Sequence, residues 1–336
     1  MRILITGASG FIGSFLVEHA LSLGMETWAA MRSTSSRRYL QDSRTRFIEL
    51  DLSDDARLHE QLAAQTAAHG AFDAVVHAAG ATQCRRAEDF FKINTEGTHR
   101  LARQLMETGA LRPDGRFVFI SSLSVWGPAS ERNLRPITTT DTPVPDTAYG
   151  LSKLKAENCL SQVEGLNYII LRPTGVYGPR ERDYYLMARS IARHIDFAAG
   201  FKPQMITFIY VRDLVQAVFL ALEKGESGHG YFLSDGGRYT SRTFSDLLQM
   251  EMGVRRVAHI VAPLWLLRAI CALGGCVARL TRRRVTLNPD KYRIMRQRNW
   301  LCDIRPAREE LGYKPEWPLT RGVHETVAWY KANGWL

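Results

Sequence analysis

A tyrosine and a lysine four residues apart form the pattern with the clearest chemistry. Tyr149 and Lys153 stand in the run Tyr-Gly-Leu-Ser-Lys, and in a helix this spacing puts both side chains on one face. A neighbouring ammonium lowers the pKa of a phenol, so Tyr149 could serve as a general acid or base, although exposed side chains on an ordinary amphipathic helix are the competing interpretation. Ser121 and Ser122, at the end of a predicted strand, favour catalysis because catalytic groups gather where the strands of open α/β sheets end.

Three glycines at a spacing of three form the second pattern. Gly7, Gly10 and Gly13 follow the apolar run at residues 2–6 and lead directly into a helical pattern. Glycines at a strand-to-helix turn allow a tight turn and a close approach of the backbone to a pyrophosphate, which the start of the helix then binds. The spacing differs by one residue from the usual G-x-G-x-x-G pattern, and a purely structural turn is the alternative. Its place after the first predicted strand favours dinucleotide binding.

Short apolar runs that alternate with longer helical patterns must position these groups. The alternation is typical of βαβ units, and therefore of a Rossmann-type α/β fold with a doubly wound parallel sheet. After about residue 173 the pattern becomes mixed, so we predict a dinucleotide-binding domain over 1–173, with a contribution from about 206–234, interwoven with a smaller substrate-binding lobe over 174–336. The predicted strands are 2–6, 27–31, 46–50, 74–77, 116–121, 168–171, 207–211 and 231–234, and the predicted helices include 11–23, 56–69, 87–108, 147–163 and 213–222.

The composition is that of an ordinary globular protein with an excess of base. The 45% apolar and 23% charged fractions exclude disordered, collagen-like and coiled-coil proteins. The net charge of +10 is typical of three classes of protein: a nucleic-acid binder, a protein that contacts anionic membranes, or an enzyme with an anionic ligand. The five cysteines are scattered and include no C-x-x-C pair, so we expect no disulfide framework, no metal site and a reducing, cytoplasmic location.

These motifs together resemble the extended short-chain dehydrogenase/reductases, which include the NAD-dependent epimerase/dehydratase family. TGASGFIG is similar to the family's cofactor loop, ISSLSVWG to its serine strand and YGLSK to its YxxxK motif. The segments LRPTGVYGP and LGYKP also fit, so the resemblance covers nearly the whole chain in the correct order. It implies an NAD(P)-dependent oxidoreductase in which Tyr149 donates or accepts the proton, Lys153 lowers its pKa and holds the ribose, and Ser122 hydrogen-bonds the substrate oxygen.

The resemblance also implies which residues line the cofactor and the substrate. Asp51 and Leu52 look like the family's adenine-contacting pair, Asn94 like the helix asparagine that supports the site, and Pro173 like the residue beside the nicotinamide. The cofactor-binding residues that we expect are Gly7, Ser9, Gly10, Phe11, Ile12, Gly13, Arg32, Ser33, Asp51, Leu52, His77, Ala78, Ala79, Gly80, Asn94, Tyr149, Lys153 and Pro173. By position after these segments, the expected walls of the substrate pocket are Thr82, Ser124, Trp126, Tyr177 and Arg182.

The end of the second predicted strand bears on the form of the cofactor. An NAD enzyme usually has an acid there for the ribose hydroxyls, whereas an NADP enzyme has an arginine near the extra phosphate. Here Met31 occupies the place of the acid, Arg32 and Ser33 follow, and Arg37 and Arg38 are close behind. We therefore expect NADP(H) as the preferred cofactor, with NAD(H) as the alternative.

Two departures from the sugar-nucleotide enzymes of the family bear on the reaction. Those enzymes typically carry an Asn where this chain has Gly175 and an Arg-Asp pair where it has Ile206 and Thr207, both used around a diphosphate. We therefore predict an oxidoreductase that interconverts a ketone and a secondary alcohol on a fairly apolar or amphipathic substrate, as in the dihydroflavonol reductase and 3β-hydroxysteroid dehydrogenase branch. A nucleotide-sugar epimerase or dehydratase, whose diphosphate other basic residues could hold, is the alternative. A non-catalytic cofactor-binding sensor is the third hypothesis.

The segment 262–280 combines an apolar face with a basic neighbourhood. Its pattern predicts an amphipathic helix that serves as a core helix or lid, as a homodimer contact, or as a peripheral contact with an anionic membrane, which Arg282, Arg283 and Arg284 would favour. Residues 279–298 carry eight basic residues against one acid, a net charge of +7 that leaves +3 for the rest. Base is thus concentrated in one patch over about 262–298. A single basic patch argues against nucleic-acid binding as the main function. The expected partner is therefore a small-molecule substrate with an anionic tail, or a lipid surface.

Overall fold

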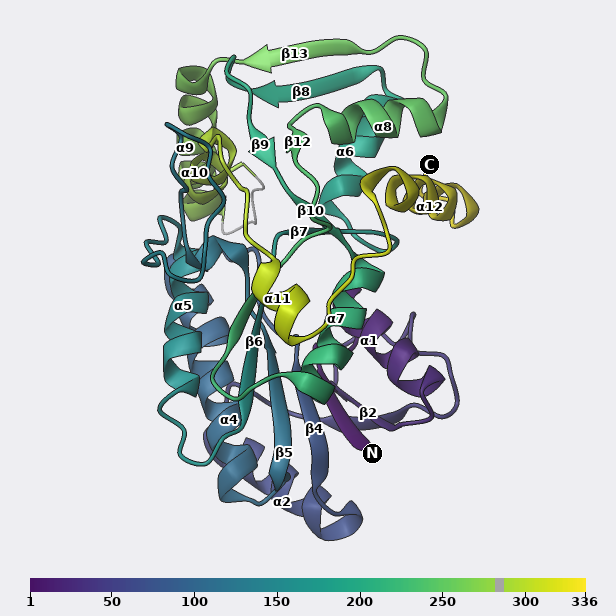
Figure 1. Cartoon of the computed structure of the whole chain (residues 1–336), viewed down its shortest axis with the longest axis vertical. Coiled ribbons are helices and arrows are strands. Elements are labelled where there is room, and N and C mark those ends of the chain that lie inside the picture. Colours follow the sequence, from purple (N-terminus) through teal and green to yellow (C-terminus); the bar gives the residue numbers. More distant parts are fainter. Residues whose placement is uncertain (282–286) are drawn as a thin grey trace.

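A parallel sheet of seven strands forms the centre of the larger part of the molecule (Figure 1). The computed structural model describes residues 1–281 and 287–336, and side chains up to residue 277 and from residue 287. The strand order is β11-β6-β5-β4-β1-β2-β3, and it reverses between β1 and β4, the switch point at which α/β sheets of this kind bind ligands. The strands are β1 (Arg2–Thr6), β2 (Glu26–Met31), β3 (Arg46–Glu49), β4 (Phe72–His77), β5 (Leu111–Ile120), β6 (Tyr168–Pro173) and β11 (Gly230–Leu233).

Helices cover both faces of this sheet and create two separate hydrophobic cores. α1 (Phe11–Ser22) and α7 (Val211–Lys224) pack on one face, whereas α2 (Asp55–His69), α4 (Gly97–Glu107) and α5 (Ala148–Leu160) pack on the other. Successive side chains of β1 alternate between the cores, with Ile3 and Ile5 in the first and Leu4 in the second. Burial on both faces explains why the strands are continuous apolar runs in the sequence. The predicted Rossmann-type α/β fold is confirmed.

The predicted helix over 87–108 is divided into three parts. α3 (Ala87–Phe90) is followed by a π-helical turn (Phe91–Glu96) and then by α4. The turn carries Asn94, whose side chain is fully buried. Single π-helical turns inside helices occur frequently at functional sites. The apolar spacing of the sequence could not reveal this widening, because it changes the register of the helix by less than one turn.

The smaller lobe is built from three two-stranded sheets and the helices around them. The pairs are β7 (Gly175–Tyr177) with β10 (Phe208–Tyr210), β9 (Met205–Ile206) with β12 (Tyr239–Thr240), and β8 (Ile195–Ala199) with β13 (Ala258–Ala262). Helices α6 (Asp183–Ala192), α8 (Thr243–Met252) and α12 (Leu319–Ala332) complete it, whereas α11 (Arg305–Glu310) packs against β11 of the main sheet. Between β10 and β12, α7 and β11 return the chain to the main sheet, so the two parts are linked by several crossings rather than by one.

Two helices, α9 (Leu264–Thr281) and α10 (Pro289–Arg296), lie side by side at the end of the molecule away from the strands of the main sheet (Figure 1). Among the described side chains, α9 buries only Leu267 and Cys271, and it adds none to either hydrophobic core. The interpretation as a core helix is therefore wrong, because the apolar stripe is turned outward. Residues 282–284, with their three arginines, lie outside the described residues. In the described part of the chain, no helix is long and apolar enough to cross a membrane.

Candidate active site

The loop between β1 and α1 is packed so closely that two of its glycines leave no room for a side chain. Gly7 has a φ of +70°, and a Cβ on it would lie 2.7 Å from the nitrogen of Ala79, in the segment after β4. A Cβ on Gly13 would overlap the carbonyl oxygen of Gly7. α1 follows Gly10 with no capping side chain and no acid in its first turn. Its first N–H groups and the positive end of its dipole therefore suit a phosphate.

His77, at the end of β4, is a buried strut rather than a proton carrier. Its Nδ1 lies 2.7 Å from the Thr6 hydroxyl and its Nε2 lies 2.9 Å from the Thr98 hydroxyl, so the ring joins β4 to β1 and α4. Burial, together with the smaller effect of the Lys153 charge, lowers the pKa of His77 to about 3. The imidazole is therefore neutral at working pH, and only the backbone of this segment faces the glycine loop.

Asn94 fastens the segment after β4 to α5. Its side-chain oxygen accepts the N–H of Ala81 at 2.7 Å, and its amide nitrogen donates to the Ala81 carbonyl and to the Ser152 hydroxyl, both at 3.0 Å. Gly80 lies between these groups, and a Cβ on it would be 3.1 Å from the Asn94 oxygen and 3.3 Å from the Lys153 ammonium. A glycine at this position thus leaves space beside the ammonium that a side chain would fill.

Ser122, Tyr149 and Lys153 meet at the carboxyl end of β5. Ser122 begins a short 3-10 turn (Leu123–Val125), where its hydroxyl accepts the N–H of Ser124 at 3.2 Å and hydrogen-bonds the Tyr149 phenol. Tyr149 lies in the first turn of α5, which begins where the Thr147 side chain caps a backbone N–H. Capping by a threonine fixes the start of a helix, and so fixes the position of this phenol. The i,i+4 spacing then places Lys153 one turn further along the same face.

Lys153 is buried against the end of β5. Its side chain is about 5% exposed, and its Nζ donates to the Ile120 carbonyl at 2.8 Å and lies 4.5 Å from the centre of the Phe119 ring. Burial lowers the pKa of Lys153 to about 8, whereas the Glu157 carboxylate one turn away acts in the opposite direction. The ammonium is therefore still charged at neutral pH, but by a small margin.

The expectation that Lys153 lowers the pKa of Tyr149 is not met. Burial raises the pKa of Tyr149, because a phenolate loses its hydration there, and the hydrogen bond from Ser122 is the opposing effect. The Lys153 ammonium is turned to the Ile120 carbonyl instead. In this arrangement Tyr149 is protonated at neutral pH and can act as a general acid toward a carbonyl oxygen.

The sequence analysis did not predict the buried ion pair between Glu157 and Arg172, which lies next to the site. Glu157 accepts hydrogen bonds from the Ser121 hydroxyl and from Arg172 on β6, whose guanidinium nitrogen lies 2.9 Å away. Both charged side chains are largely buried, and the Arg172 guanidinium also lies 4.4 Å from the centre of the Trp126 ring. The network ties α5 to the ends of β5 and β6. Its sequence signal was available, because Tyr149, Lys153 and Glu157 follow one another at four-residue steps.

The end of β2, where the ribose of a dinucleotide would lie, is followed by arginine side chains, and no carboxylate stands there. Arg32 and Ser33 are exposed directly after Met31. The Arg37 guanidinium lies over the Phe47 ring, 4.0 Å from its centre. Asp51, after β3, is a half-buried carboxylate whose oxygen accepts two hydrogen bonds from Ser53, which hold its pKa below the usual range. This carboxylate is therefore already engaged, and neighbouring Leu52 is half-buried.

The expected substrate residues fall in different environments. Thr82 and Arg182 are exposed on the loops after β4 and before α6, and Ser124 is half-buried beside Ser122. Trp126 is buried against Phe232 and donates its indole N–H to the Asp141 carbonyl at 2.9 Å.

Tyr177 is not a pocket wall. It is fully buried among the rings of Tyr184, Phe208 and Phe244, because β7 turns its side chain into the aromatic core of the smaller lobe.

Gly175 and Thr207, the two departures from the sugar-nucleotide pattern, are both enclosed. A Cβ on Gly175 would overlap the Tyr184 hydroxyl, so this phenol fills the space that a side chain at position 175 would take. The Thr207 hydroxyl donates to the Trp300 carbonyl at 2.7 Å and lies 2.8 Å from the hydroxyl of Thr174. Neither position presents an amide or a cation to a ligand.

α10 joins the two lobes next to the site, which the sequence did not predict. The Asp290 carboxylate accepts the N–H of Ala148, the residue before Tyr149, at 3.0 Å. The neighbouring Lys291 ammonium lies 3.7 Å from the carboxylate of Asp183 at the start of α6. The basic helix is thus held to both lobes, through its own Asp290 on one side and through Asp183 on the other, and its place next to Tyr149 makes it a border of the site.

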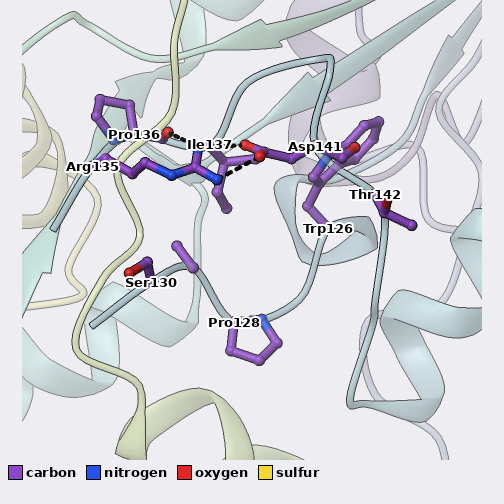
Figure 2. A pocket seen from close by; sticks show the side chains of 9 residues that line it. Trp126, Pro128, Ser130, Arg135, Pro136, Ile137, Asp141 and Thr142 are labelled. Atoms are coloured by element: carbon purple, nitrogen blue, oxygen red, sulfur yellow. Dashed lines mark hydrogen bonds and ion pairs between the residues drawn. The ribbon is translucent and has the colours of Figure 1, made fainter. Parts of the chain in front are cut away.

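A cavity of about 170 Å³ lies inside the long loop between Trp126 and α5 (Figure 2). The Arg135 guanidinium pairs with the Asp141 carboxylate across it at 2.6 Å. From the C-terminal part of the chain, the Asn299 side-chain amide donates to the carbonyls of Ser130 and Arg135 and holds the loop in place. Neither the phenol nor the ammonium of the site lines this cavity. It therefore belongs to the packing of the loop and not to the reaction site.

Comparison with known proteins settles the family. The pattern of the NAD dependent epimerase/dehydratase family matches residues 3–233, which span the glycine loop, the serine strand and the Tyr-Lys pair. The chain belongs to this family. It is therefore an NAD(P)-dependent enzyme of the extended short-chain dehydrogenase/reductase type, as the sequence motifs predicted. Support for the narrower dihydroflavonol reductase and hydroxysteroid dehydrogenase branch comes from sequence features alone.

The relatives within the family act on different molecules. The chain is 26% identical to the UDP-glucose 4-epimerase of Vibrio cholerae over 98% of this chain and 96% of the relative. It is also 26% identical to sterol demethylase protein B of Methylococcus capsulatus, over the full length of both chains. The solved UDP-glucose 4-epimerase of Thermotoga maritima, complexed with UDP-glucose, has a TM-score of 0.77 at 23% identity and covers 99% of both chains. This last likeness shows the shared fold.

Proposed function

We propose that this enzyme interconverts a ketone and a secondary alcohol on an apolar or amphipathic molecule. When bound, the nicotinamide cofactor supplies or accepts the hydride at the carbinol carbon. Tyr149 donates the proton to the carbonyl oxygen, and Ser122 hydrogen-bonds that oxygen as its negative charge develops. Tyr149 is protonated at neutral pH, since burial raises the pKa of its phenol, so it has a proton to donate when the reaction runs in the direction of reduction.

The roles of the cofactor residues follow from their positions. The loop over 7–13 and the start of α1 would hold the pyrophosphate, and Asp51 and Leu52 the adenine end. Lys153 and Tyr149 would hold the ribose next to the nicotinamide, with the backbone of 77–80 and Pro173 as walls. The space beside Gly80, in front of the buried Lys153 ammonium, supports this placement.

The observation that carries the choice of substrate is the filled space at position 175. Because the Tyr184 phenol occupies it, and because the Thr207 hydroxyl is bound to the Trp300 carbonyl, the two positions that serve a diphosphate in sugar-nucleotide enzymes have no group to offer here. A diphosphate without paired cations or donors would lose its hydration with little in return. An uncharged ketone avoids this loss.

A nucleotide-sugar epimerase or dehydratase is the second candidate, and the relatives support it better than they support the first. The Vibrio cholerae relative carries that activity over almost the same length. Both candidates share the first step, which is removal of a hydride from a secondary alcohol or its reverse. They differ in whether the hydride returns to the same molecule.

We further propose NADP(H) as the preferred cofactor. Met31 ends β2 without a carboxylate for the ribose hydroxyls, and Arg32 follows it on the surface. The nearest acids support this proposal, since Asp51 is held by Ser53 and Glu49 pairs with Arg57 at 2.9 Å. Replacement Met31→Asp is expected to lower the ratio of kcat/KM for NADPH to that for NADH by about tenfold or more, because a carboxylate repels the extra phosphate. Equal efficiencies of the native enzyme with both cofactors would contradict the preference.

A substrate panel tests the function directly. The purified enzyme is incubated with NADPH and lipophilic ketones, and separately with UDP- and dTDP-sugars. Net oxidation of NADPH by a ketone supports the proposal, whereas isomerised or dehydrated sugar nucleotide without net oxidation overturns it in favour of the second candidate. Tyr149→Phe is expected to reduce kcat by about 10²–10⁴-fold while the cofactor Kd changes little, because the phenol oxygen carries the proton transfer. Tight cofactor binding with no turnover of any substrate would favour the third hypothesis, a non-catalytic cofactor-binding sensor.

The filled space at Gly175 has its own test. Gly175→Asn is expected to destabilise the fold by about 1–3 kcal/mol, because its side chain overlaps the Tyr184 hydroxyl. Tyr184→Ala removes the phenol, so Gly175→Asn should cost less stability in the Tyr184→Ala background than in the native enzyme, as measured by urea unfolding of all four proteins. If Gly175→Asn alone leaves stability unchanged, the space is not filled and the argument against a diphosphate fails.

A further inference from the structure

The face formed by α9, β8 and β13 exposes an unusual amount of apolar surface. Trp265 and Leu273 on α9 are 72% and 66% exposed, and Phe197 and Phe201, in and just after β8, are 61% and 77% exposed. Ile260 on β13, which pairs with Phe197 in the register of the two strands, is also exposed. Large apolar side chains gathered on one surface mark a contact with a partner or a membrane. We call this surface the α9 face.

The parts of the α9 face are joined to one another. β8 pairs with β13 in parallel, and β13 leads through Pro263 into α9. The Gly200 N–H donates to the Ala262 carbonyl at 2.9 Å, and a Cβ on Gly200 would lie 3.2 Å from the Leu264 side chain. Phe201 therefore lies next to the start of α9. In Figure 1 these three elements occupy the end of the molecule opposite to the lower end of the main sheet.

The chain segment that contains β13 and α9 carries charge of one sign. Residues 252–289 contain seven arginines and no Asp or Glu. Among the described residues, Lys202, Arg255, Arg256 and Arg268 are exposed and form no ion pair. The one acid on the paired strands, Asp196, is buried and bonded to Ser245 and His259. Cations without partners around an apolar face complement a surface of fixed negative charge.

We propose that the α9 face docks on an anionic lipid membrane, with Trp265 and Leu273 inserted among the acyl chains and with Arg255, Arg256 and Arg268 at the headgroups. Interfacial helices of this kind have an apolar face, a basic border and an aromatic residue at the boundary. α9 has these features, and it lacks the length and apolarity to cross the bilayer. The docked face adjoins the site, because α9 packs on α10 and α10 holds the start of α5 through Asp290. This inference does not depend on the substrate proposed above.

Vesicle binding tests the proposal. The full-length enzyme is sedimented with vesicles of phosphatidylcholine alone and of phosphatidylcholine with phosphatidylglycerol, at low and high salt. Binding is expected to the anionic vesicles at low salt and to weaken by about tenfold or more at high salt. Trp265→Glu and Leu273→Glu should each abolish it, and the double variant Arg255→Glu/Arg256→Glu should weaken it by about tenfold.

Matched controls separate docking from misfolding and from self-association. Leu23→Glu changes an apolar side chain that is 52% exposed just after α1, and this variant should bind vesicles like the native enzyme. Activity on a water-soluble ketone, or cofactor binding, should be unchanged in all these variants. Fluorescence quenching by brominated lipid should fall on Trp265→Phe. No binding to anionic vesicles at low salt, equal binding by Trp265→Glu, or a dimer that Trp265→Glu dissociates and that binds no lipid would each overturn the proposal.

Discussion

Burial of the Lys153 ammonium links the stability of the fold to pH. The folded pKa of about 8 lies below the ordinary value of 10.5 because the side chain is desolvated. Between these two values the unfolded chain binds more protons than the folded chain, so the free energy of unfolding rises with pH through this window. Below pH 8 both states carry the charge, and the full cost of burying it applies.

This linkage predicts the behaviour of Lys153→Met. Relative to that variant, the native enzyme should become more stable by on the order of 2–3 kcal/mol between pH 7 and pH 10.5. Urea unfolding of both proteins across this range measures the difference. Lys155→Met, at an exposed lysine on the same helix, serves as the control and should show no such trend. A difference between native enzyme and Lys153→Met that stays constant with pH would contradict the desolvation of Lys153.

At the scale of single residues, the sequence predicts those features of the site that depend on local backbone geometry. Tyr149 and Lys153 share a face because of their spacing, and Ser122 meets them because β5 ends beside α5. Where the Lys153 ammonium points depends on the Ile120 carbonyl, and Tyr177 is buried by rings from distant segments. Contacts of this kind leave no periodic signal, so the pKa of Tyr149 and the place of Tyr177 could not be predicted.

At the scale of elements, the Glu157–Arg172 pair fixes the position of α5 against the sheet. Both partners are largely buried, so removal of one leaves an uncompensated charge in a poorly hydrated place. Glu157→Gln is therefore expected to lower the free energy of unfolding by about 3–5 kcal/mol. Asp246→Asn breaks an exposed i,i+4 pair with Arg242 and should cost less than about 1 kcal/mol in the same urea titration. Equal effects of the two replacements would show that the buried pair is no more important than a surface pair.

The element boundaries that the sequence predicts well are those of the main sheet. β1 is predicted residue for residue, because each buried strand is a short apolar run between turn residues. The prediction fails where a helix has an apolar face without a core to cover it. The same amphipathic pattern suits a core helix and an interfacial helix, and only the position of α9 at the end of the molecule distinguishes them.

At the scale of the whole molecule, the residues that we propose to bind the cofactor come from segments far apart in the chain. The glycine loop follows β1, the basic end follows β2, and the Tyr-Lys pair lies on α5. A ligand that binds all three segments stabilises the folded state and not the unfolded chain. The order of these motifs along the chain was enough to predict the family. The contact of α10 with both lobes could not be predicted in this way, because it depends on single pairs such as Asp290 with the Ala148 N–H.

Thermal unfolding with cofactor tests this global coupling together with the cofactor preference. At a concentration of about 100 times Kd, a ligand adds about 2.7 kcal/mol to the free energy of unfolding, which for a chain of this size corresponds to a rise in Tm of about 5 °C. NADPH should therefore raise Tm more than NADH does at equal concentration, because the exposed Arg32 after β2 attracts the extra phosphate. Arg32→Ala should remove the difference between the two cofactors, whereas Arg193→Ala, at an exposed arginine in the smaller lobe, should keep it. An equal rise with both cofactors in the native enzyme would show that this arginine does not select between them.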